Sequence, residues 1–246
     1  MTESAGPIGS GIDALMDQYQ AVSHNIANSS TAGFKRRITT FSAELDRLMR
    51  ELDEQTPISS AQVESRQRTD FSQGALVATD RLLDVGLEGK GFLVLETPSG
   101  TLYTRNGVLQ VNLLGQLVDG AGRLVAGANG PIVIPNNVGL SEINIGPDGT
   151  VRGGDAELGR LKVVEFEDAV SELVCANYSS FMAPQGVVPS EAKQTTVRQG
   201  YQESSNVGLM EEMVSLMTLS RLYETHMNIL RRQRENTSAA LSVANG

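Results

Sequence analysis

Two apolar stripes with the same spacing lie near the two ends of the chain. The first recurs at alternating steps of three and four residues and consists of Ile12, Leu15, Tyr19, Val22 and Ile26. The second uses the same steps and consists of Leu209, Met213, Leu216, Ser220, Tyr223, Met227 and Leu230. This period keeps a narrow apolar seam on one face of a helix, as in a coiled coil. The pattern therefore predicts two terminal helices whose seams are buried against other helices.

Polar residues beside the seams predict where these helices stop and start. The first helix is expected over about residues 8–28, because Asn28 opens a Ser-, Thr- and Gly-containing stretch typical of a helix end and turn. The second is expected to begin at residues 204–206, whose Ser-Ser-Asn sequence is suited to an N-cap. It continues to about residue 244 without a proline.

Two further patterns add to the helical part of the chain. A second apolar file, formed by Met210, Val214 and Met217, lies beside the seam of the last helix. A helix with two apolar files can contact more than one neighbour. Another helix is predicted over residues 41–56, where apolar residues recur at helical spacing until Pro57 ends the pattern.

Between about residues 82 and 200 the pattern changes from helical to strand-like. Short runs rich in Val, Ile, Leu and Thr are bounded by Gly, Pro, Asn and Asp. Runs spaced this tightly predict antiparallel strands rather than βαβ units. The predicted fold class is therefore α+β, with discontinuous N- and C-terminal coiled-coil-like helices flanking an antiparallel all-β middle domain.

This pattern divides the chain into four regions. They are an N-terminal helix and turn over residues 1–40, a partly helical or extended connector over 41–80, the β domain over 81–203, and the C-terminal helix over 204–246.

Charge and composition narrow the possible functions. The net charge of -9 argues against nucleic-acid binding, which needs a concentrated basic surface. The basic residues Lys35, Arg36 and Arg37, and the group at 231–234, are expected to be solvated helix ends or charge contacts between subunits. The sequence lacks an apolar run of membrane-spanning length and a cleavable signal at its start, so no membrane insertion is expected.

Candidate catalytic and metal-binding residues are sparse. His24 and His226 are the two histidines, and neither has a second ligand at metal-binding spacing. The glycines at 86, 89 and 91 match neither the dinucleotide-binding nor the Walker pattern, and they are more typical of a bulge or a tight strand crossing. We therefore expect no catalytic residue, no metal, no cofactor and no small-molecule substrate.

Four stretches of the sequence resemble one known family. His-Asn-Ile-Ala-Asn-Ser-Ser-Thr-Ala-Gly-Phe-Lys at 24–35 is similar to the N-terminal signature of bacterial flagellar rod and hook proteins. Residues 83–92, ending in Gly-Lys-Gly-Phe, and the Tyr-Thr-Arg-Asn-Gly turn at 103–107 resemble the middle of that family. Residues 200–207 and 211–214 resemble the segment leading into its last helix. The chain is thereby identified as a member of the flagellar basal-body rod protein family.

The resemblance implies a structural axial subunit that is not an enzyme. Such a subunit polymerises through its terminal helices into a drive shaft and export conduit, and it leaves the cytoplasm through the flagellar type III apparatus without a cleaved signal. Its implied partners are copies of itself, other rod subunits in the basal body and the export apparatus. The expected interface comprises the apolar residues of both seams together with Asn28, Gly33, Phe34 and Asn206.

The identity of the subunit within the family leaves alternatives open. The chain length, the short connector and the Leu-Gly-Arg-Leu-Lys-Val-Val stretch at 158–164 look closest to a proximal rod subunit. A distal rod subunit is the alternative. A remote alternative from another class is a secreted β-domain binding module or carbohydrate-active enzyme, which would need a concave pocket with convergent polar groups.

Overall fold

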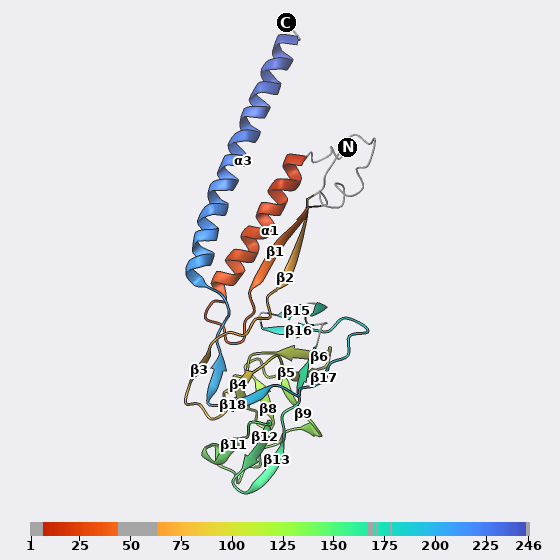
Figure 1. Cartoon of the computed structure of the whole chain (residues 1–246), viewed down its shortest axis with the longest axis vertical. Coiled ribbons are helices and arrows are strands. Elements are labelled where there is room, and N and C mark those ends of the chain that lie inside the picture. The colour runs from red at the N-terminus through yellow and green to blue at the C-terminus, as the bar shows by residue number, and fades with distance from the viewer. Residues whose placement is uncertain (1–6, 44–62, 167–169, 171, 178, 245–246) are drawn as a thin grey trace. The chain divides into compact units, whose positions relative to one another are not determined.

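The computed structural model describes residues 7–43, 63–166, 170, 172–177 and 179–244 (Figure 1). The chain divides into two compact units, each assembled from segments that are far apart in the sequence. The helical unit comprises residues 1–27, 37–68 and 208–246. The β unit comprises residues 28–36 and 69–207.

The helical unit contains the two terminal helices. Helices α1 (Pro7–Ala27) and α3 (Leu209–Ala244) run antiparallel and side by side within it (Figure 1). Helix α1 also contacts β1 (Arg37–Ala43), which pairs with β2 (Val63–Thr69). Because α1 has 21 residues and α3 has 36, the last turns of α3 continue past the start of α1.

The buried side chains of the helical unit are mostly small. On α1 they include Ala14, Ala21 and Val22, and on α3 they include Leu219. Short side chains at the contact allow two helices to approach closely, since interaxial distance depends on the residues between them. Glu212 of α3 is also buried in this unit.

The β unit consists of antiparallel strands in four sheets. Its largest sheet has ten strands, β5 (Phe92–Thr97), β6 (Gly100–Thr104), β7 (Leu109–Val111), β8 (Leu117–Asp119), β9 (Leu124–Gly127), β10 (Gly130–Pro131), β14 (Val163–Glu165), β15 (Val174–Asn177), β16 (Ser180–Met182) and β17 (Ser190–Glu191). A second sheet contains β11 (Ile143–Ile145), β12 (Thr150–Gly153) and β13 (Ala156–Arg160), preceded by a 3-10 turn over Leu140–Glu142. The two remaining sheets pair β4 (Val85–Glu88) with β18 (Thr196–Gln199) and β3 (Leu76–Ala78) with β19 (Tyr201–Glu203).

Two hydrophobic clusters fill the β unit. The larger is aliphatic and includes Val85, Leu93, Leu95 and Val151, each 0% exposed. The smaller is aromatic and is centred on Phe92, whose ring makes edge-to-face contacts with those of Phe71, Phe166 and Phe181. Burial of this apolar surface is the main favourable term in the folding of the unit.

The packed terminal helices and the antiparallel β-sheets between them in sequence confirm the predicted α+β class. Two local predictions are wrong. Residues 41–43, the start of the helix predicted over 41–56, form the end of β1, and residues 44–56 lie outside the described residues. Helix α3 begins at Leu209 rather than after a cap at 204–206, and Gly208 O accepts the Glu212 amide at 3.0 Å. None of the described helices is both long enough and apolar enough to cross a membrane.

Candidate assembly site

The turn predicted after the first helix is fixed inside the β unit. Asn28 O accepts a hydrogen bond from Thr31 N at 3.1 Å, and Thr31 O accepts one from Phe34 N at 3.2 Å. Gly33 has φ +65°, and a Cβ at this position would lie 2.5 Å from the carbonyl carbon of Arg105. Only glycine fits both the backbone conformation and this close approach. The predicted residues Asn28, Gly33 and Phe34 are all buried here.

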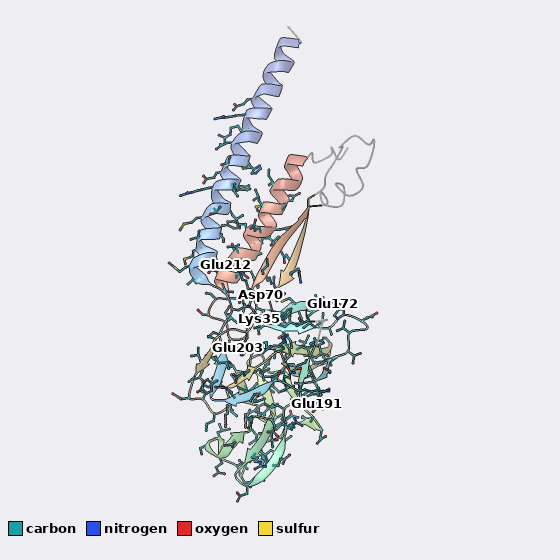
Figure 2. All side chains as sticks on the ribbon, in the orientation of Figure 1. Lys35, Asp70, Glu172, Glu191, Glu203 and Glu212 are labelled. Atoms are coloured by element: carbon teal, nitrogen blue, oxygen red, sulfur yellow. The ribbon has the colours of Figure 1, made fainter. Side chains whose placement is uncertain are left out.

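A buried charge cluster, formed by Lys35, Arg105 and Glu203, follows this turn. Lys35 Nζ lies 2.6 Å from Glu203 Oε1 and donates a further hydrogen bond of 2.6 Å to Ser72 O. Figure 2 labels Lys35 and Glu203 within the β unit. Arg105 Nη1 lies 3.5 Å from Glu203 Oε2, while Nη2 donates to Gly89 O at 2.7 Å. The three side chains are at most 2% exposed, so their interaction is weakly screened by water.

Glu203 is the carboxylate that both cations of the charge cluster contact. Its Oε1 also accepts a hydrogen bond from Gly74 N at 2.8 Å, and its backbone carbonyl accepts one from Gly33 N at 2.7 Å. Burial lowers the pKa of Lys35, and the attraction of Glu203 offsets only part of that effect. Burial also lowers the pKa of Arg105. Loss of any one of these side chains should therefore destabilise the β unit, because the remaining charges would be buried without a partner and without water.

The burial of Lys35 corrects the prediction made for it. Lys35 was expected at a solvated helix end or in a charge contact between subunits, yet its side chain is 0% exposed and paired within the chain. The physical reason is that Glu203 and a backbone carbonyl satisfy two of the three ammonium donors inside the β unit.

Asn206 joins the same part of the β unit. Its Oδ1 accepts a hydrogen bond from Arg36 N at 2.7 Å. Its Nδ2 donates to Asp70 O at 2.9 Å and to Ser72 Oγ at 3.0 Å. One amide side chain thus joins residue 206 to two other segments of the β unit, at residue 36 and at residues 70–72.

These contacts join the two segments of the β unit that adjoin the terminal helices in sequence. Residue 28 follows α1 directly, and residue 207 is separated from α3 by one residue. Within the β unit, segments 28–36 and 203–207 are joined by the charge cluster, by the Gly33–Glu203 backbone bond and by Asn206. The folded β unit therefore joins residues 28–36, which follow α1 in sequence, to residues 203–207, which precede α3.

The predicted seam residues lie on α1 and α3, and many are exposed in the single chain. Those between 37% and 44% exposed are Tyr19, Leu209, Met213, Tyr223 and Met227. Those that are half-buried are Ile12, Leu15, Ile26, Leu216 and Ser220, whereas Val22 is buried. The side chain of Leu230 lies outside the described residues. On α3 the most buried positions, Glu212 and Leu219, each precede a seam residue by one.

Helices α1 and α3 leave a cavity between some of their seam residues. A cavity of about 380 Å³ in the helical unit is lined by Leu15, Met16, Tyr19, Leu219, Ser220, Tyr223 and Glu224. Four predicted seam residues, Leu15, Tyr19, Ser220 and Tyr223, belong to this lining. The seams are therefore only partly filled by each other within one chain.

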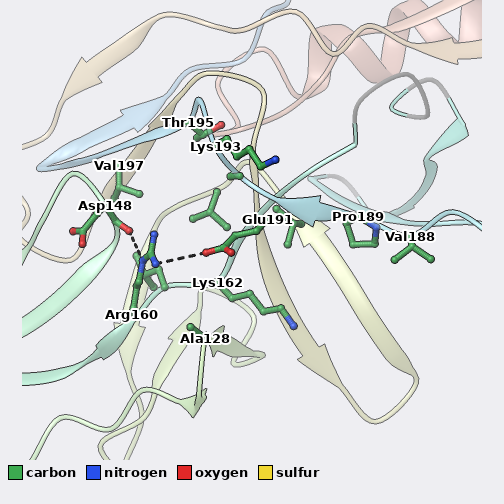
Figure 3. A pocket seen from close by; sticks show the side chains of 14 residues that line it. Ala128, Asp148, Arg160, Lys162, Val188, Pro189, Glu191, Lys193, Thr195 and Val197 are labelled. Carbon is green, nitrogen blue, oxygen red and sulfur yellow. Dashed lines mark hydrogen bonds and ion pairs between the residues drawn. The ribbon is translucent and has the colours of Figure 1, made fainter.

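The β unit also has a groove, and its chemistry bears on the enzyme alternative (Figure 3). The groove has a volume of about 610 Å³, and none of the 14 residues that line it is aromatic. Arg160 lies 3.6 Å from Glu191 and donates to the backbone carbonyl of Asp148 at 2.9 Å. Hydrogen bonds from the hydroxyl and amide of Thr150 lower the pKa of Asp148. A carboxylate kept ionised in this way is a poor general acid, and a wall without aromatic rings offers no platform for a sugar.

The described residues contain no group of three His, Cys, Asp or Glu side chains placed to hold a metal ion.

Comparison with known proteins agrees with this geometry. The flagellar hook protein FlgE/F/G D1 domain matches residues 86–153, and the flagellar basal body rod FlgEFG protein C-terminal region matches residues 198–243. The rod protein FlgF of Salmonella typhimurium is 32% identical over 241 residues, which cover 92% of this chain and 91% of that protein. The chain belongs to the flagellar basal-body rod protein family. The rod protein FlgG of Buchnera aphidicola (Schizaphis graminum) is 30% identical over 237 residues, covering 87% of this chain and 89% of that protein.

Membership of the rod family gives the chain a structural, non-enzymatic role in the flagellar basal-body rod and in motility. Membership also implies assembly with rod subunits. Relatives named FlgF and FlgG match this chain at similar identity, as the FlgF of Escherichia coli does at 30% over 243 residues. These matches therefore establish the family, but they do not distinguish a FlgF-type from a FlgG-type rod subunit.

Sequence reasoning missed the partnership of Arg105 and Glu203 with Lys35. A signal was present, because each of the three lies inside one of the stretches that resemble the rod family, at 24–35, 103–107 and 200–207. Charged residues inside otherwise apolar or turn-forming motifs were candidates for one shared buried site. Their pairing could not be derived from spacing, because 168 positions separate Lys35 from Glu203.

Proposed function

We propose that this chain is the proximal subunit of the flagellar rod and that it polymerises through its terminal helices to form part of the drive shaft and export conduit. The observation that carries the proposal is the exposure of predicted seam residues in a single chain, above all Leu209, Met213, Tyr223 and Met227. Exposed apolar residues in a row on a helix are typical of a surface that another protein covers.

Two features support polymerisation through helices rather than through the sheets. The cavity between Tyr19 and Tyr223 has apolar side chains on both walls, with Ser220 and Glu224 also on the α3 side, and it lies between the two seams. A side chain from a neighbouring subunit would bury apolar surface there that the single chain leaves open. Heterologous contacts that do not close into a ring build filaments, which is the geometry a rod requires.

The proposed interface retains the residues expected from sequence, with two different roles. The seam residues of α1 and α3 contact neighbouring subunits. Asn28, Gly33, Phe34 and Asn206 act inside the β unit, where they belong to the segments that adjoin the two helices in sequence. Export without a cleaved signal, through the flagellar export apparatus, completes the proposal.

Leu216→Asp tests polymerisation through the seam. Leu216 is half-buried in the single chain, and a carboxylate at this position would have to lose water when a neighbour covers it. We expect the variant to be absent from basal bodies isolated from the host bacterium and the cells to be non-motile. Ile26→Asp, in the other seam, is expected to act in the same way.

A matched control separates this effect from misfolding. Leu140→Asp places the same charge on the β unit, at a residue that is 55% exposed, and should enter basal bodies normally. The purified Leu216→Asp protein should keep the circular dichroism of the folded β unit. Normal rods built from Leu216→Asp subunits would contradict the proposal.

The choice of a proximal subunit is supported by the chain length, the short connector and the Leu-Gly-Arg-Leu-Lys-Val-Val stretch at 158–164. FlgF relatives cover 92–95% of this chain and FlgG relatives cover 87–93%. The distal subunit is the second candidate, because FlgG relatives reach 31% identity. Deleting the gene and identifying the rod proteins that remain attached to basal bodies tests this choice. Retention of the other rod subunits would favour the distal assignment over the proximal one.

A further inference from the structure

The cavity between α1 and α3 contains a single charged side chain, which has no partner in the described part of the chain. Among the residues that line the cavity, only Glu224 carries a charge. Its carboxylate makes no ion pair or hydrogen bond with another described residue, and neither do the hydroxyl groups of Tyr19 and Tyr223. Ser220 Oγ donates to Leu216 O at 3.0 Å and can still accept through its own lone pairs. The lining therefore presents one negative charge and several available hydrogen-bond acceptors.

This lining matches the side chain of an arginine. Arginine has five N–H donors and no acceptor, and its planar group can pair with a carboxylate and stack on aromatic rings. A cation within about 6 Å of a tyrosine ring is also attracted to the ring face. The alkyl stem of an arginine can cover apolar side chains, here Leu15 and Leu219, while its charged end stays hydrogen-bonded. An arginine therefore satisfies the polar and the apolar parts of the cavity together, which a leucine or a carboxylate does not.

The far part of α3 carries two exposed arginines, Arg231 and Arg232. Counted from Leu209 they are residues 23 and 24 of α3, whereas the antiparallel α1 has 21 residues, so they lie at or beyond its start. Neither makes an ion pair with another described residue. At about 100° per residue, Arg232 lies about 220° around the helix from the buried Leu219, on the side away from α1. Both arginines are thus open to another chain.

The charges along α3 favour one register for two parallel copies. In register, Glu224 of each copy would lie at the level of Glu224 of the other, and Arg221 at the level of Arg221, which is unfavourable. A displacement of about eight residues, or about 12 Å along the axis, brings Arg232 of one copy to the level of Glu224 of the other. At that displacement no two carboxylates and no two arginines of α3 share a level. Parallel displaced copies therefore bring opposite charges together at the cavity.

We propose that this cavity receives an arginine from a second copy of the chain. Arg232 of the neighbouring copy, flanked by its Arg231, enters the cavity and pairs with Glu224, and the two copies are parallel and displaced along α3. The contact is heterologous, because the cavity and the arginines lie on different parts of the surface, and its repetition extends a filament instead of closing a dimer.

This contact rests on the proposed function, because it identifies the side chain of a neighbour that fills the space between the two seams. Polymerisation through the seams needs apolar surface to be covered, whatever the covering side chain is. The arginine contact adds a charge requirement at Glu224, so variants that change charge at this position separate the two proposals.

Charge reversals on both sides of the contact test the pairing. Glu224→Arg should reduce the amount of this subunit in isolated basal bodies at least about tenfold, because it brings like charges together where water is largely displaced. Arg231→Glu combined with Arg232→Glu should have a similar effect from the other side. A chain that carries all three changes should return to within about twofold of the wild-type amount, since each contact again joins opposite charges.

A matched control and a folding check accompany these variants. Glu157→Arg makes the same charge change at an exposed residue of the β unit and should enter basal bodies normally. Glu224, Arg231 and Arg232 are exposed in the single chain, so the circular dichroism of each purified variant should match that of the wild type. Exclusion of Glu157→Arg to the same extent would assign the effect to net charge and overturn the proposal.

Replacement of the arginines by lysines separates the shape of the guanidinium from its charge. Arg231→Lys combined with Arg232→Lys keeps both charges but removes the planar groups, and it should lower assembly about two- to tenfold. Assembly at the wild-type level would overturn the assignment of a guanidinium to the cavity.

The same basal-body measurement distinguishes failure of this contact from failure of the proposed function. If Glu224→Arg enters basal bodies normally while Leu216→Asp is excluded, the arginine contact is wrong and polymerisation through the seam stands. If Leu216→Asp enters normally, polymerisation through the seam is wrong, and the arginine contact falls with it. A chain with all three charge reversals that stays excluded would overturn the second copy as the occupant of the cavity.

Discussion

The β unit buries its central apolar residues, whereas the helical unit leaves many of its apolar residues exposed. In the β unit, the central residues Val85, Leu87, Leu93 and Leu95 are completely buried within one chain. In the helical unit, eight apolar residues of α3 between Leu209 and Met227 are 37–76% exposed. The β unit thus completes its own core, whereas the helical unit presents surfaces that further chains can complete. The free energy of unfolding of the monomer should therefore come mainly from the β unit, whereas the function proposed above uses the helical unit for assembly.

Charged residues sharpen this comparison. The β unit buries Lys35, Arg105 and Glu203 together, at a place that joins distant segments. The helical unit instead carries exposed charges along α3, where they can meet another chain. Buried charges make a fold sensitive to the loss of a partner, while exposed charges tune association with little effect on folding. Charged residues therefore contribute to folding in the β unit, whereas on α3 they are available for contacts with other chains.

The largest expected effect comes from breaking the charge cluster. Glu203→Gln removes the anion between Lys35 and Arg105 and should lower the free energy of unfolding of the β unit by about 3–5 kcal/mol. Glu88→Gln is the matched control, because Glu88 lies 2.7 Å from Arg198 with both side chains about half exposed. It should cost about 0–1 kcal/mol. Urea denaturation measures both, and equal effects would contradict the role given to burial.

Truncating one leucine in each unit tests the difference in apolar packing. Leu95→Ala, at a residue that is 0% exposed, should lower the free energy of unfolding of the β unit by about 2–5 kcal/mol. Leu222→Ala, at a residue of α3 that is 44% exposed, should change monomer stability by about 0.5 kcal/mol or less. Thermal or urea unfolding of the two variants provides the measurement. A large loss for Leu222→Ala would show that the helical unit is already a closed core.

The smallest expected effect is a response of the helical unit to acid. Burial, and then the nearby Arg37, lower the pKa of His24 below its usual 6.5. Below about pH 6.5 the unfolded chain therefore binds more protons than the folded one, so stability falls as the pH drops toward the folded pKa. Hydrogen exchange of α1 between pH 7 and pH 5 should show the loss.

Two variants check the cause of that acid response. His24→Gln should remove the pH dependence, because glutamine does not titrate. Arg37→Gln should reduce it, since the smaller of the two causes is then absent while burial remains. An unchanged slope in His24→Gln would assign the acid response to another group.

Local patterns predicted most helices and strands, because each type of element gives a short-range periodic pattern of apolar residues. The alternating steps around Val22 and Leu216 indicated the terminal helices, and the short β-branched runs indicated the sheets. Prediction failed at residues 41–43, where Phe41 was assigned to a helix although Ile38, Thr39 and Thr40 just before it favour a strand. The helical period continued into residues that pair with β2 instead.

The contact line of α3 was harder to predict than the helix itself. The predicted seam included Met213 and Ser220, whereas the positions buried in the single chain are Glu212 and Leu219. The helix carries apolar residues on several sides, so periodicity alone does not say which side meets α1 and which meets another chain. The charge cluster lay beyond such reasoning altogether, because its members meet only when strands far apart in sequence have paired.

The separation between Lys35 and Glu203 also sets an order of events in time. Their contact spans 168 positions, which a ribosome adding about 5–20 residues per second covers in about 8–34 s. Until Glu203 emerges, Lys35 and Arg105 lack the carboxylate that pairs with both of them in the folded β unit. The charge cluster is thus among the last contacts of the β unit that a nascent chain can complete.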